Sequence, residues 1–217
     1  MYIDDLMVQK TLLKDVNYYF ITDEGIAIPP HEQVEKAVDA GVKMIQYRDK
    51  SSEGRELYEE ACKIRAVCED SLFIVNDRLD VAMAVGADGV HLGQDDLPPQ
   101  VARDVVGDDM IIGISTHDLE QAEKAKEIAD YIGIGPVHST DTKQGTSKEL
   151  GIEGALKIAS KVDVPTAAIG GIEEADLKRL AEGVDMVCAI SSVTREGNLS
   201  DRTHLFEEMF SKAKRGD

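Results

Sequence analysis

Eight short aliphatic runs alternate with longer amphipathic stretches along the chain, and this alternation predicts an α/β fold, a (β/α)8 or TIM barrel. Most of the eight runs are continuously apolar, which is typical of parallel strands buried on both faces. Such barrels need at least about 200 residues, and this chain has 217. We therefore expect one domain spanning residues 1–217, with an extra helix at its N-terminus.

The expected elements follow one another in strand–helix order. We expect strands at 17–23, 42–49, 72–77, 89–93, 110–116, 131–137, 165–171 and 186–192. Helical patterns between them, such as 31–41, 54–70 and 118–130, each keep an apolar stripe at helical spacing. Asp118 or His117 is the candidate start of the last of these helices, and Gly41 follows the first. Residues 1–14 are expected to form the extra helix, which would cap the bottom of the barrel.

An open, doubly wound sheet is the alternative α/β architecture. It would usually carry fewer than eight strands, and its dinucleotide-binding form has a GxGxxG fingerprint directly after the first strand. The segment YYFITDEG at 18–25 has no such fingerprint. The barrel is therefore the better prediction.

The composition excludes several classes of protein. The chain has 24 Lys and Arg against 42 Asp and Glu, a formal charge of −18, which argues against a nucleic-acid partner. No stretch approaches the roughly 18 apolar residues of a membrane span, and the N-terminus lacks the apolar core of a signal peptide. The three cysteines form no CxxC pair, as expected of a reduced protein. We expect a cytoplasmic protein that binds small molecules and no membrane, and we leave a homo-oligomer open.

Carboxylates follow two successive strands of the predicted barrel. Asp77 comes directly after the third strand, and Asp96 follows the fourth. Active sites of TIM barrels lie at the C-terminal ends of the strands, so the two carboxylates can face one pocket. Mg²⁺ typically binds one or two carboxylates together with phosphate oxygens. The two aspartates therefore suggest a Mg²⁺ site that faces a phosphorylated ligand.

Cations and small residues at other strand ends suggest two phosphate sites. Alternation along the second strand places Gln46, Arg48 and Lys50 on one side, which suits a polyphosphate, and turns Tyr47 away from the pocket. Lys143, in the loop after the sixth strand, could join this group. Glycines 170–171 and serines 191–192, after strands seven and eight, could form the phosphate cradle that is common in barrels.

Each of these features has an ordinary structural explanation. A QxRxK run is common on surfaces, Asn-Asp is a frequent turn, and Gly-Gly often makes a tight strand–helix connection. Their joint occurrence at the same ends of successive strands favours a functional site. His91, inside the fourth strand, is interpreted as a packed or barrel-lining residue. His117 and His138 have no obvious acid partner in the sequence, so a histidine-rich metal site is not indicated.

Four stretches together resemble the thiamine-phosphate synthase family, also called thiamine-phosphate pyrophosphorylase. They are GVKMIQYRDK, NDRLDVAMAVGADGVHLGQDDLP, GISTHDLEQAEKAKEIADYIGIGPVHSTDTK and AAIGGI, and the resemblance runs from about residue 17 to 195. It implies a (β/α)8 barrel enzyme, a Mg²⁺-dependent transferase of a pyrimidinylmethyl group. The family joins hydroxymethylpyrimidine diphosphate to a thiazole phosphate, or its carboxylated form, and releases pyrophosphate.

The resemblance also implies roles for individual residues. Asp77 and Asp96 match the Mg²⁺ ligands of the family. The residues that match its pyrophosphate-binding groups are Arg48, Lys50, Asn76 and Lys143, and those that match its contacts to the pyrimidine and its leaving group are Gln46 and Ser115. Thr140 and Thr142 belong to the strand-six loop near the substrates. The thiazole-phosphate cradle is matched by Gly171, Ile190 and Ser191. Ser115 and Lys143 are the residues expected to take part in catalysis.

The expected reaction is a dissociative substitution, in which the thiazole nitrogen attacks the methylene carbon after pyrophosphate departs. That nitrogen carries no proton, so no protein base is required, in agreement with the lack of a His–acid pair in the sequence. Three alternatives are weighed against it. They are a related barrel that aromatises thiazole phosphate or regulates thiamine genes, a non-catalytic phosphate sensor, and a sugar-phosphate isomerase. The first needs no Mg²⁺–pyrophosphate set, and the last needs an acid–base pair.

Overall fold

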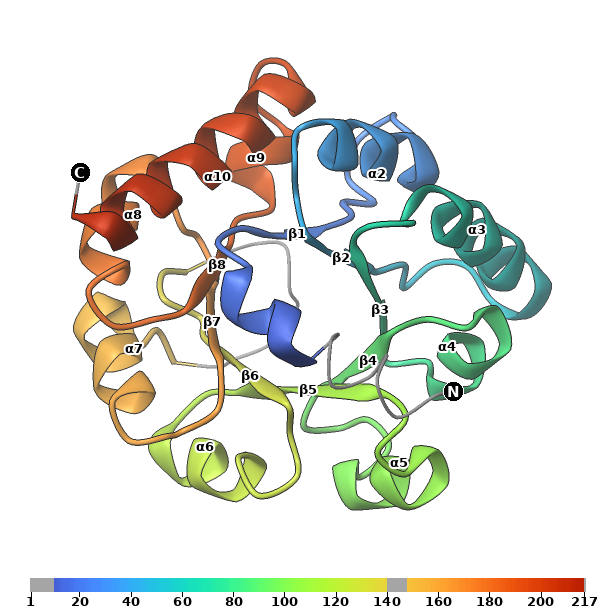
Figure 1. Cartoon of the computed structure of the whole chain (residues 1–217), viewed down its shortest axis with the longest axis horizontal. Helices are drawn as coiled ribbons and strands as arrows, with labels where there is room; N and C mark the ends of the chain where they lie inside the picture. Colours follow the sequence, from blue (N-terminus) through green and yellow to red (C-terminus); the bar gives the residue numbers. More distant parts are fainter. Residues whose placement is uncertain (1–9, 140–147, 217) are drawn as a thin grey trace.

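The computed structural model describes residues 10–139 and 148–216, and their strands form one parallel sheet in the order β1 to β8 (Figure 1). The sheet closes where Tyr18 forms a parallel bridge with Val187, and the Val187 N–H donates to the Asn17 carbonyl at 3.0 Å. The (β/α)8 barrel expected from the sequence is confirmed. The assignment of all of 1–217 to one domain stays a prediction, since part of the chain lies outside the described residues.

Each observed strand lies within its expected range and is shorter than that range. The strands are β1 (Tyr19–Ile21), β2 (Met44–Tyr47), β3 (Leu72–Asn76), β4 (Gly89–Leu92), β5 (Ile111–Thr116), β6 (Tyr131–Ile134), β7 (Thr166–Ile169) and β8 (Met186–Cys188). The residues beyond their C-terminal ends begin the loops that carry the polar groups.

A ring of helices surrounds the barrel (Figure 1). The helices are α2 (Pro30–Asp39), α3 (Gly54–Val67), α4 (Leu79–Val85), α5 (Pro99–Val106), α6 (Leu119–Ala125), α7 (Gly151–Ala159), α8 (Glu174–Leu180), α9 (Ser191–Thr194) and α10 (Leu199–Arg215). Asp118, one of the two expected starts of α6, accepts the Gln121 N–H at 2.8 Å and caps that helix. This helix was expected to reach residue 130, but it ends at Ala125.

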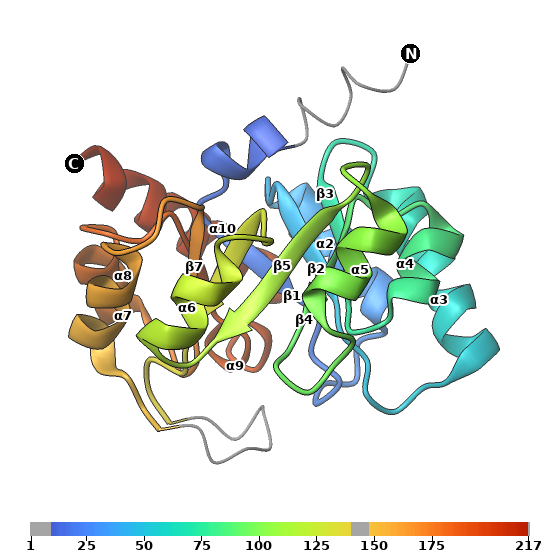
Figure 2. The ribbon, with the colours of Figure 1, turned by 90° about the horizontal axis from the view of Figure 1, so that it is seen from below.

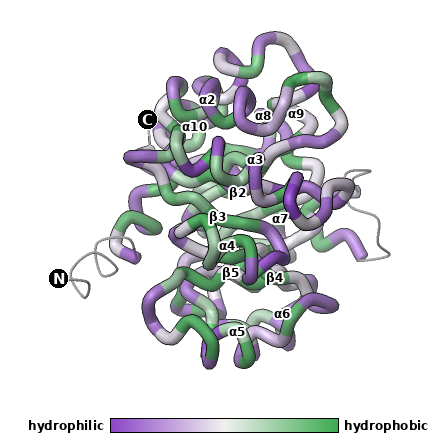
Figure 3. Tube along the Cα trace, turned by 90° about the vertical axis from the view of Figure 1, so that its right-hand side faces the viewer, coloured by the Kyte–Doolittle hydropathy of each residue, from purple (hydrophilic) through white to green (hydrophobic). Residues whose placement is uncertain are grey.

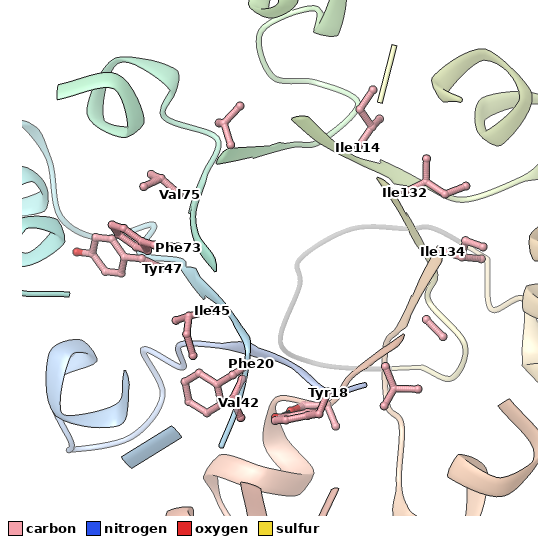
Figure 4. Close-up of a cluster of buried hydrophobic side chains, with 14 of the residues drawn as sticks. Tyr18, Phe20, Val42, Ile45, Tyr47, Phe73, Val75, Ile114, Ile132 and Ile134 are labelled. Atoms are coloured by element: carbon pink, nitrogen blue, oxygen red, sulfur yellow. Dashed lines mark hydrogen bonds between the residues drawn. The ribbon is translucent and has the colours of Figure 1, made fainter. Parts of the chain in front are cut away.

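Side chains of alternate strand residues form two separate cores. Tyr18, Phe20, Ile45, Tyr47 and Phe73 point outward between the strands and the helices (Figure 4). The residues between them face the barrel interior and pack there in a second cluster. Tyr47 therefore points away from the pocket, as its position in the second strand predicted. The alternation also decides which polar residues can meet inside the barrel.

The described part of the N-terminal segment crosses the N-terminal ends of the strands. Figure 2 shows this segment at the end of the barrel where β5 begins, opposite its arrowhead. Residues 10–12 are helical and continue into the 3-10 turn η1 (Leu13–Asp15). Leu13 and Val16 are buried in the inner cluster with Met44, the first residue of β2. The extra N-terminal helix is thus present, and its expected start at residues 1–9 lies outside the described residues.

Hydropathy follows this layered arrangement. Hydrophobic stretches run along inner strands such as β3, and hydrophilic stretches concentrate in the outer helices and loops (Figure 3). Within 10–139 and 148–216, no helix has the length and apolar character to cross a membrane. Cys62, Cys68 and Cys188 are all free thiols, as expected of a reduced protein.

Candidate active site

Two neighbouring carboxyls lie where β3 and β4 end. Asp77 has φ = 60°, and among the described residues it is the non-glycine with a positive φ. Its N–H donates to the His91 carbonyl at 2.8 Å, which anchors it to β4. Asp96 reaches back to the same strand end, where its Oδ2 accepts the Gly93 N–H at 2.7 Å. The carboxyl of Asp96 lies beside that of Asp77, close enough to raise the pKa of Asp77.

The surroundings of Asp77 change its affinity for protons. Burial, and then the carboxyl of Asp96, raise the pKa of Asp77 above its ordinary value. Lys50, whose ammonium forms an ion pair with Asp77, partly offsets this increase. Two facing carboxylates concentrate negative charge in a partly buried place. The pair is therefore disposed to bind a cation.

The end of β2 is held by residues that follow β1. Thr22 Oγ1 donates to the Arg48 carbonyl at 3.0 Å and accepts the Arg48 N–H at 2.9 Å. Glu24 accepts the backbone N–H groups of Lys50 at 2.9 Å and Ser51 at 3.1 Å. Its second oxygen lies 3.4 Å from the Arg48 guanidinium. Glu24 therefore fixes the loop that presents both predicted pyrophosphate-binding cations.

Asp49 also orders this loop from its outer side. It accepts the N–H groups of Ser51 and Ser52, each at 2.8 Å. Burial opposes ionisation of Asp49, but these hydrogen bonds outweigh it and lower the pKa of Asp49 well below its ordinary value. Asp49 is thus a structural anion and does not belong to the carboxylate pair.

The predicted contacts to the pyrimidine, Gln46 and Ser115, both take part in hydrogen bonds inside the barrel. Gln46 is 3% exposed, and its Nε2 donates to the Tyr19 hydroxyl at 2.6 Å. Ser115 Oγ lies 2.9 Å from Nε2 of His91, and its carbonyl accepts the Gln94 side chain at 2.6 Å. His91 therefore lines the barrel interior, as its position inside the fourth strand suggested.

The glycines after β7 adopt left-handed backbone conformations. Gly170 and Gly171 have φ values of 102° and 60°, which few other residues adopt readily. A Cβ at Gly171 would lie 2.9 Å from the Cβ of His138, so the loop after β6 approaches it closely. Ser192 Oγ donates to the Ile172 carbonyl at 2.7 Å, which joins the loops after β7 and β8.

Ile190 and Ser191 form the start of α9, the short helix after β8. Ile190 is its N-cap residue and Ser191 its first residue. The first N–H groups of a helix have no partner within that helix, and they point outward from its N-terminal end. Together with Gly171, these two residues form the part of the molecule predicted to hold the thiazole phosphate.

Three residues of the predicted site lie outside the described residues. They are Thr140, Thr142 and Lys143, which belong to 140–147. On the near side of this segment, His138 Nε2 lies 3.1 Å from Asp176 Oδ2, at the start of α8. No acid partner of His138 was expected from the sequence, because Asp176 is 38 positions away. Ser139 Oγ donates to Glu149 at 2.9 Å on the far side.

Comparisons with known proteins agree with the barrel and its strand-end groups. Residues 18–193 match the family model described as thiamine monophosphate synthase. The chain belongs to this family. The matched region extends from the start of β1 into α9, so it includes every strand end considered above. The resemblance expected for residues 17 to 195 is confirmed.

Individual relatives cover nearly all of the chain. A thiamine-phosphate synthase of Methanosarcina barkeri is 36% identical over 211 residues, which are 95% of this chain and 96% of the relative. One of Archaeoglobus fulgidus is 39% identical over 204 residues, 93% of this chain and 96% of the relative. The structure of a thiamine phosphate pyrophosphorylase from Pyrococcus furiosus has a TM-score of 0.86 and 36% identity, and covers 93% of this chain and 98% of that one.

The carboxylate pair fits the Mg²⁺ that the thiamine monophosphate synthase family implies. Mg²⁺ keeps several waters and takes one or two carboxylates plus phosphate oxygens, so it needs no larger cage of protein ligands. Asp77 and Asp96 supply two oxygen-bearing groups in contact, with Lys50 beside them for phosphate. In the described part of the chain, no group of three or more His, Cys, Asp or Glu is arranged to hold a metal.

The sequence did not reveal several residues of the site. Glu24, Tyr19 and Tyr131 are ordinary residues in or after strands, and their side chains contact residues at least 24 positions away. Asp23 is another: it is buried after β1 and ion-paired to Arg195 at 2.8 Å. Only the polar character of Asp23 and Glu24 at a strand end could have signalled them.

Proposed function

We propose that the strand ends described above carry out the reaction of the thiamine monophosphate synthase family. The protein condenses a pyrimidine diphosphate with a thiazole phosphate to give thiamine monophosphate and pyrophosphate. Its substrates are small molecules. The bond between the pyrimidine methylene carbon and a diphosphate oxygen breaks, and a bond from that carbon to the thiazole nitrogen forms.

The diphosphate would lie between β2 and β3, against Asn76, Arg48 and Lys50. The planar guanidinium of Arg48 presents several N–H donors in a geometry that suits phosphate oxygens. The ammonium of Lys50 is a compact charge on a flexible side chain. Asp77 and Asp96 would hold Mg²⁺ there, and the bound ion would neutralise charge that develops on the leaving pyrophosphate. Lys143, from the loop after β6, is proposed to join these cations.

Gln46 and Ser115 are proposed to orient the pyrimidine. Both side chains are held by the barrel interior, so they can position the ring without losing much side-chain freedom on binding. Loss of pyrophosphate leaves a cation that the aminopyrimidine ring can delocalise. Ser115 would donate its hydroxyl proton in a hydrogen bond to the departing oxygen.

The thiazole phosphate is proposed to bind at Gly171, Ile190 and Ser191, with Thr140 and Thr142 nearby. This cradle holds one monophosphate through backbone N–H groups. The thiazole nitrogen attacks with its own lone pair and loses no proton. No protein base is needed, and positioning of the two substrates supplies much of the rate.

One observation carries this proposal: the contact between the Asp77 and Asp96 carboxyls with Lys50 ion-paired to the first. A site for thiazole phosphate alone would not need a carboxylate pair with a lysine beside it. A sugar-phosphate isomerase would need an acid–base pair, such as His138 with Asp176 after β6, but it would not need two neighbouring carboxyls with a lysine. The pair with its lysine instead suits a metal and a diphosphate.

The test is pyrophosphate release from both substrates, with and without Mg²⁺, by the wild type, Asp96→Asn and Asp95→Asn. Asp95 is an exposed neighbour, so its variant has the same change in charge and is the matched control. We expect release that needs Mg²⁺ and both substrates. Asp96→Asn should slow it by about 100-fold or more, because a metal ligand typically supplies several kcal/mol.

Other results would favour the alternatives. A folded wild type that binds thiazole phosphate without Mg²⁺ and releases no pyrophosphate would indicate a sensor. Equal losses in Asp95→Asn and Asp96→Asn would remove the special role of the carboxylate pair and leave only a general effect of charge.

A further inference from the structure

Five polar side chains form one continuous hydrogen-bonded chain across the interior of the barrel. Gln46 donates to Tyr19 at 2.6 Å, and the Tyr19 hydroxyl lies 2.8 Å from that of Tyr131. Tyr131 is 2.9 Å from Nδ1 of His91, and Nε2 of His91 is 2.9 Å from Ser115. The chain thus connects the two residues that are proposed to contact the pyrimidine substrate.

The connection runs through the buried middle of the molecule. Tyr19 and Tyr131 are 1% and 0% exposed, and His91 is 8% exposed. They come from β1, β6 and β4, which are not neighbours in the sheet. Tyr19 and Tyr131 meet edge to face, with ring centroids 5.7 Å apart. Burying a hydroxyl or an imidazole without a hydrogen bond costs free energy. Removal of one member of the chain would therefore leave its neighbours with an unsatisfied polar group.

Glycines make room for this chain of side chains. A Cβ at Gly113 on β5 would lie 2.1 Å from Cζ of Tyr131, so only glycine admits the ring there. At Gly133 on β6, a Cβ would lie 3.4 Å from Cε1 of His91, at ordinary contact distance. The two rings are therefore packed into fixed positions, and their polar atoms have little freedom to find other partners.

The order of donors along the chain follows from Gln46. Burial raises the pKa of both Tyr19 and Tyr131, so each stays a neutral phenol with one proton to donate. Tyr19 accepts from the Gln46 amide and so donates to Tyr131, which in turn donates to Nδ1 of His91. A neutral His91 then carries its proton on Nε2 and donates to Ser115. The hydroxyl proton of Ser115 is left for an acceptor outside this chain.

We propose that Tyr19, Tyr131 and His91 are positioning residues that couple Gln46 to Ser115. They fix the direction of donation, so that Ser115 offers its proton to the leaving diphosphate when Gln46 holds the pyrimidine through its amide. The roles of the two end residues rest on the proposed function. The tautomer of His91 does not, because it is a property of the protein without substrate.

The direct test is the ¹⁵N chemical shift of His91 in ¹⁵N-histidine-labelled protein without substrates. We expect an unprotonated Nδ1 and a protonated Nε2 in the wild type. Tyr131→Phe removes the donor to Nδ1 and should leave a mixture of the two tautomers. Tyr47→Phe is the matched control, since Tyr47 is an equally buried tyrosine on the outer face of β2. Protonation at Nδ1 in the wild type, or no response to Tyr131→Phe, would overturn the proposal.

The second test measures coupling during turnover. Tyr131→Phe should lower kcat about tenfold, which corresponds to one hydrogen bond of about 1.4 kcal/mol, and leave the KM for thiazole phosphate unchanged. Ser115→Ala should then cost much less in the Tyr131→Phe background than in the wild type. For turnover the control is Tyr58→Phe, at an exposed tyrosine of α3, which should leave both constants unchanged. Full additivity of Tyr131→Phe and Ser115→Ala would show that the chain is only structural.

The two tests separate this inference from the proposed function. If the wild type shows the expected tautomer and its response to Tyr131→Phe but releases no pyrophosphate, the directed chain stands and the proposed reaction fails. If turnover is normal but the His91 tautomer is the opposite one, the reaction stands and the directed chain fails.

Discussion

Asp77 is the residue where backbone strain and proposed function coincide. Its φ of 60° lies in the left-handed region, which aspartate tolerates better than most residues, at a cost of about 1 kcal/mol. The conformation turns the carboxyl at the end of β3 toward Asp96, which follows β4. A residue without a short polar side chain would be less readily accommodated at this position.

The contact between the two carboxyls leads to a prediction about titration. Asp96→Asn removes a negative charge from the side of Asp77, so the pKa of Asp77 should fall toward its ordinary value. The ¹³C shift of the Asp77 carboxyl, followed against pH without metal, measures this. Asp95→Asn, with the same change in charge at an exposed neighbour, should move the pKa of Asp77 much less. A pKa of Asp77 unaffected by Asp96→Asn would mean that the carboxyls do not interact.

Gly113 leads to a prediction about stability. A methyl group at this position meets the Tyr131 ring, which is fully buried and has nowhere to move. Gly113→Ala should therefore reduce the free energy of unfolding by about 1–3 kcal/mol, a typical cost of overpacking. Gly133→Ala should reduce the free energy of unfolding less, because its Cβ would lie 3.4 Å from the nearest side-chain atom. Urea unfolding of both variants measures the difference, and equal costs would contradict the packing argument.

At the level of elements, Asp23 in the loop after β1 joins the end of α9 to α2. Asp23 is 5% exposed and accepts from Arg195 Nε at 2.8 Å and from Thr194 Oγ1 at 2.7 Å. The Gln33 side chain of α2 bonds both the N–H and the carbonyl of Asp23, at 2.9 Å each. This cluster holds in place the short helix whose first residues are predicted to bind phosphate.

The charge state of Asp23 predicts a pH dependence of stability. Burial opposes its ionisation, but hydrogen bonds from Arg195, Thr194 and Gly25 outweigh burial and lower its pKa below 3.8. A group with a lowered folded-state pKa stabilises the protein above its unfolded pKa and loses that effect as pH falls through the folded value. Asp23→Asn should therefore cost about 1–3 kcal/mol at pH 7. The difference from the wild type should shrink below about pH 4.

Urea unfolding of the wild type and Asp23→Asn at several pH values between 7 and 3 measures this difference. Asp39→Asn is the control, because Asp39 is an exposed residue at the end of α2. It should cost little at any of these pH values. A cost of Asp23→Asn that stays constant down to the lowest pH would show that the carboxylate charge is not what stabilises the cluster.

At the scale of the whole molecule, the barrel depends on contacts between the two ends of the sequence. β8 pairs with the start of β1, and Glu207 of α10 accepts the Tyr18 N–H at 2.9 Å and the Asn17 side chain at 2.7 Å. Phe206 and Phe210 of the same helix are fully buried in the outer core. α10 runs along the outside from α8 to α2 (Figure 1). The last helix thus holds the first strand in place.

This closure predicts that the whole chain unfolds in one transition. No part of the sheet has its own closed core, so opening the β1–β8 edge exposes the inner cluster from both sides. Urea unfolding curves from far-UV circular dichroism, which reports helices, and from near-UV signals of the buried tyrosines should coincide. Two separate transitions would contradict the assignment of residues 1–217 to a single domain.

The parts of the fold that depend on local pattern could be predicted from the sequence. The eight strands and the strand-end position of Asp77 follow from short apolar runs that alternate with helical patterns, and from the rule that strand ends carry function. Tyr47 was expected to face outward because side chains alternate along a strand, and it does. The end of α6 was missed, because the apolar stripe at 118–130 continues beyond the last helical turn.

The number and order of the strands, the parity of the second strand and the kind of group at each strand end could all be derived from the sequence. Which of these groups meet depends on how the barrel closes. Tyr19 and Tyr131 are 112 positions apart on strands that are not neighbours, and they touch only because the sheet closes into a barrel. Closure places inward residues of different strands in one layer, and its tilt and stagger depend on all eight strands together.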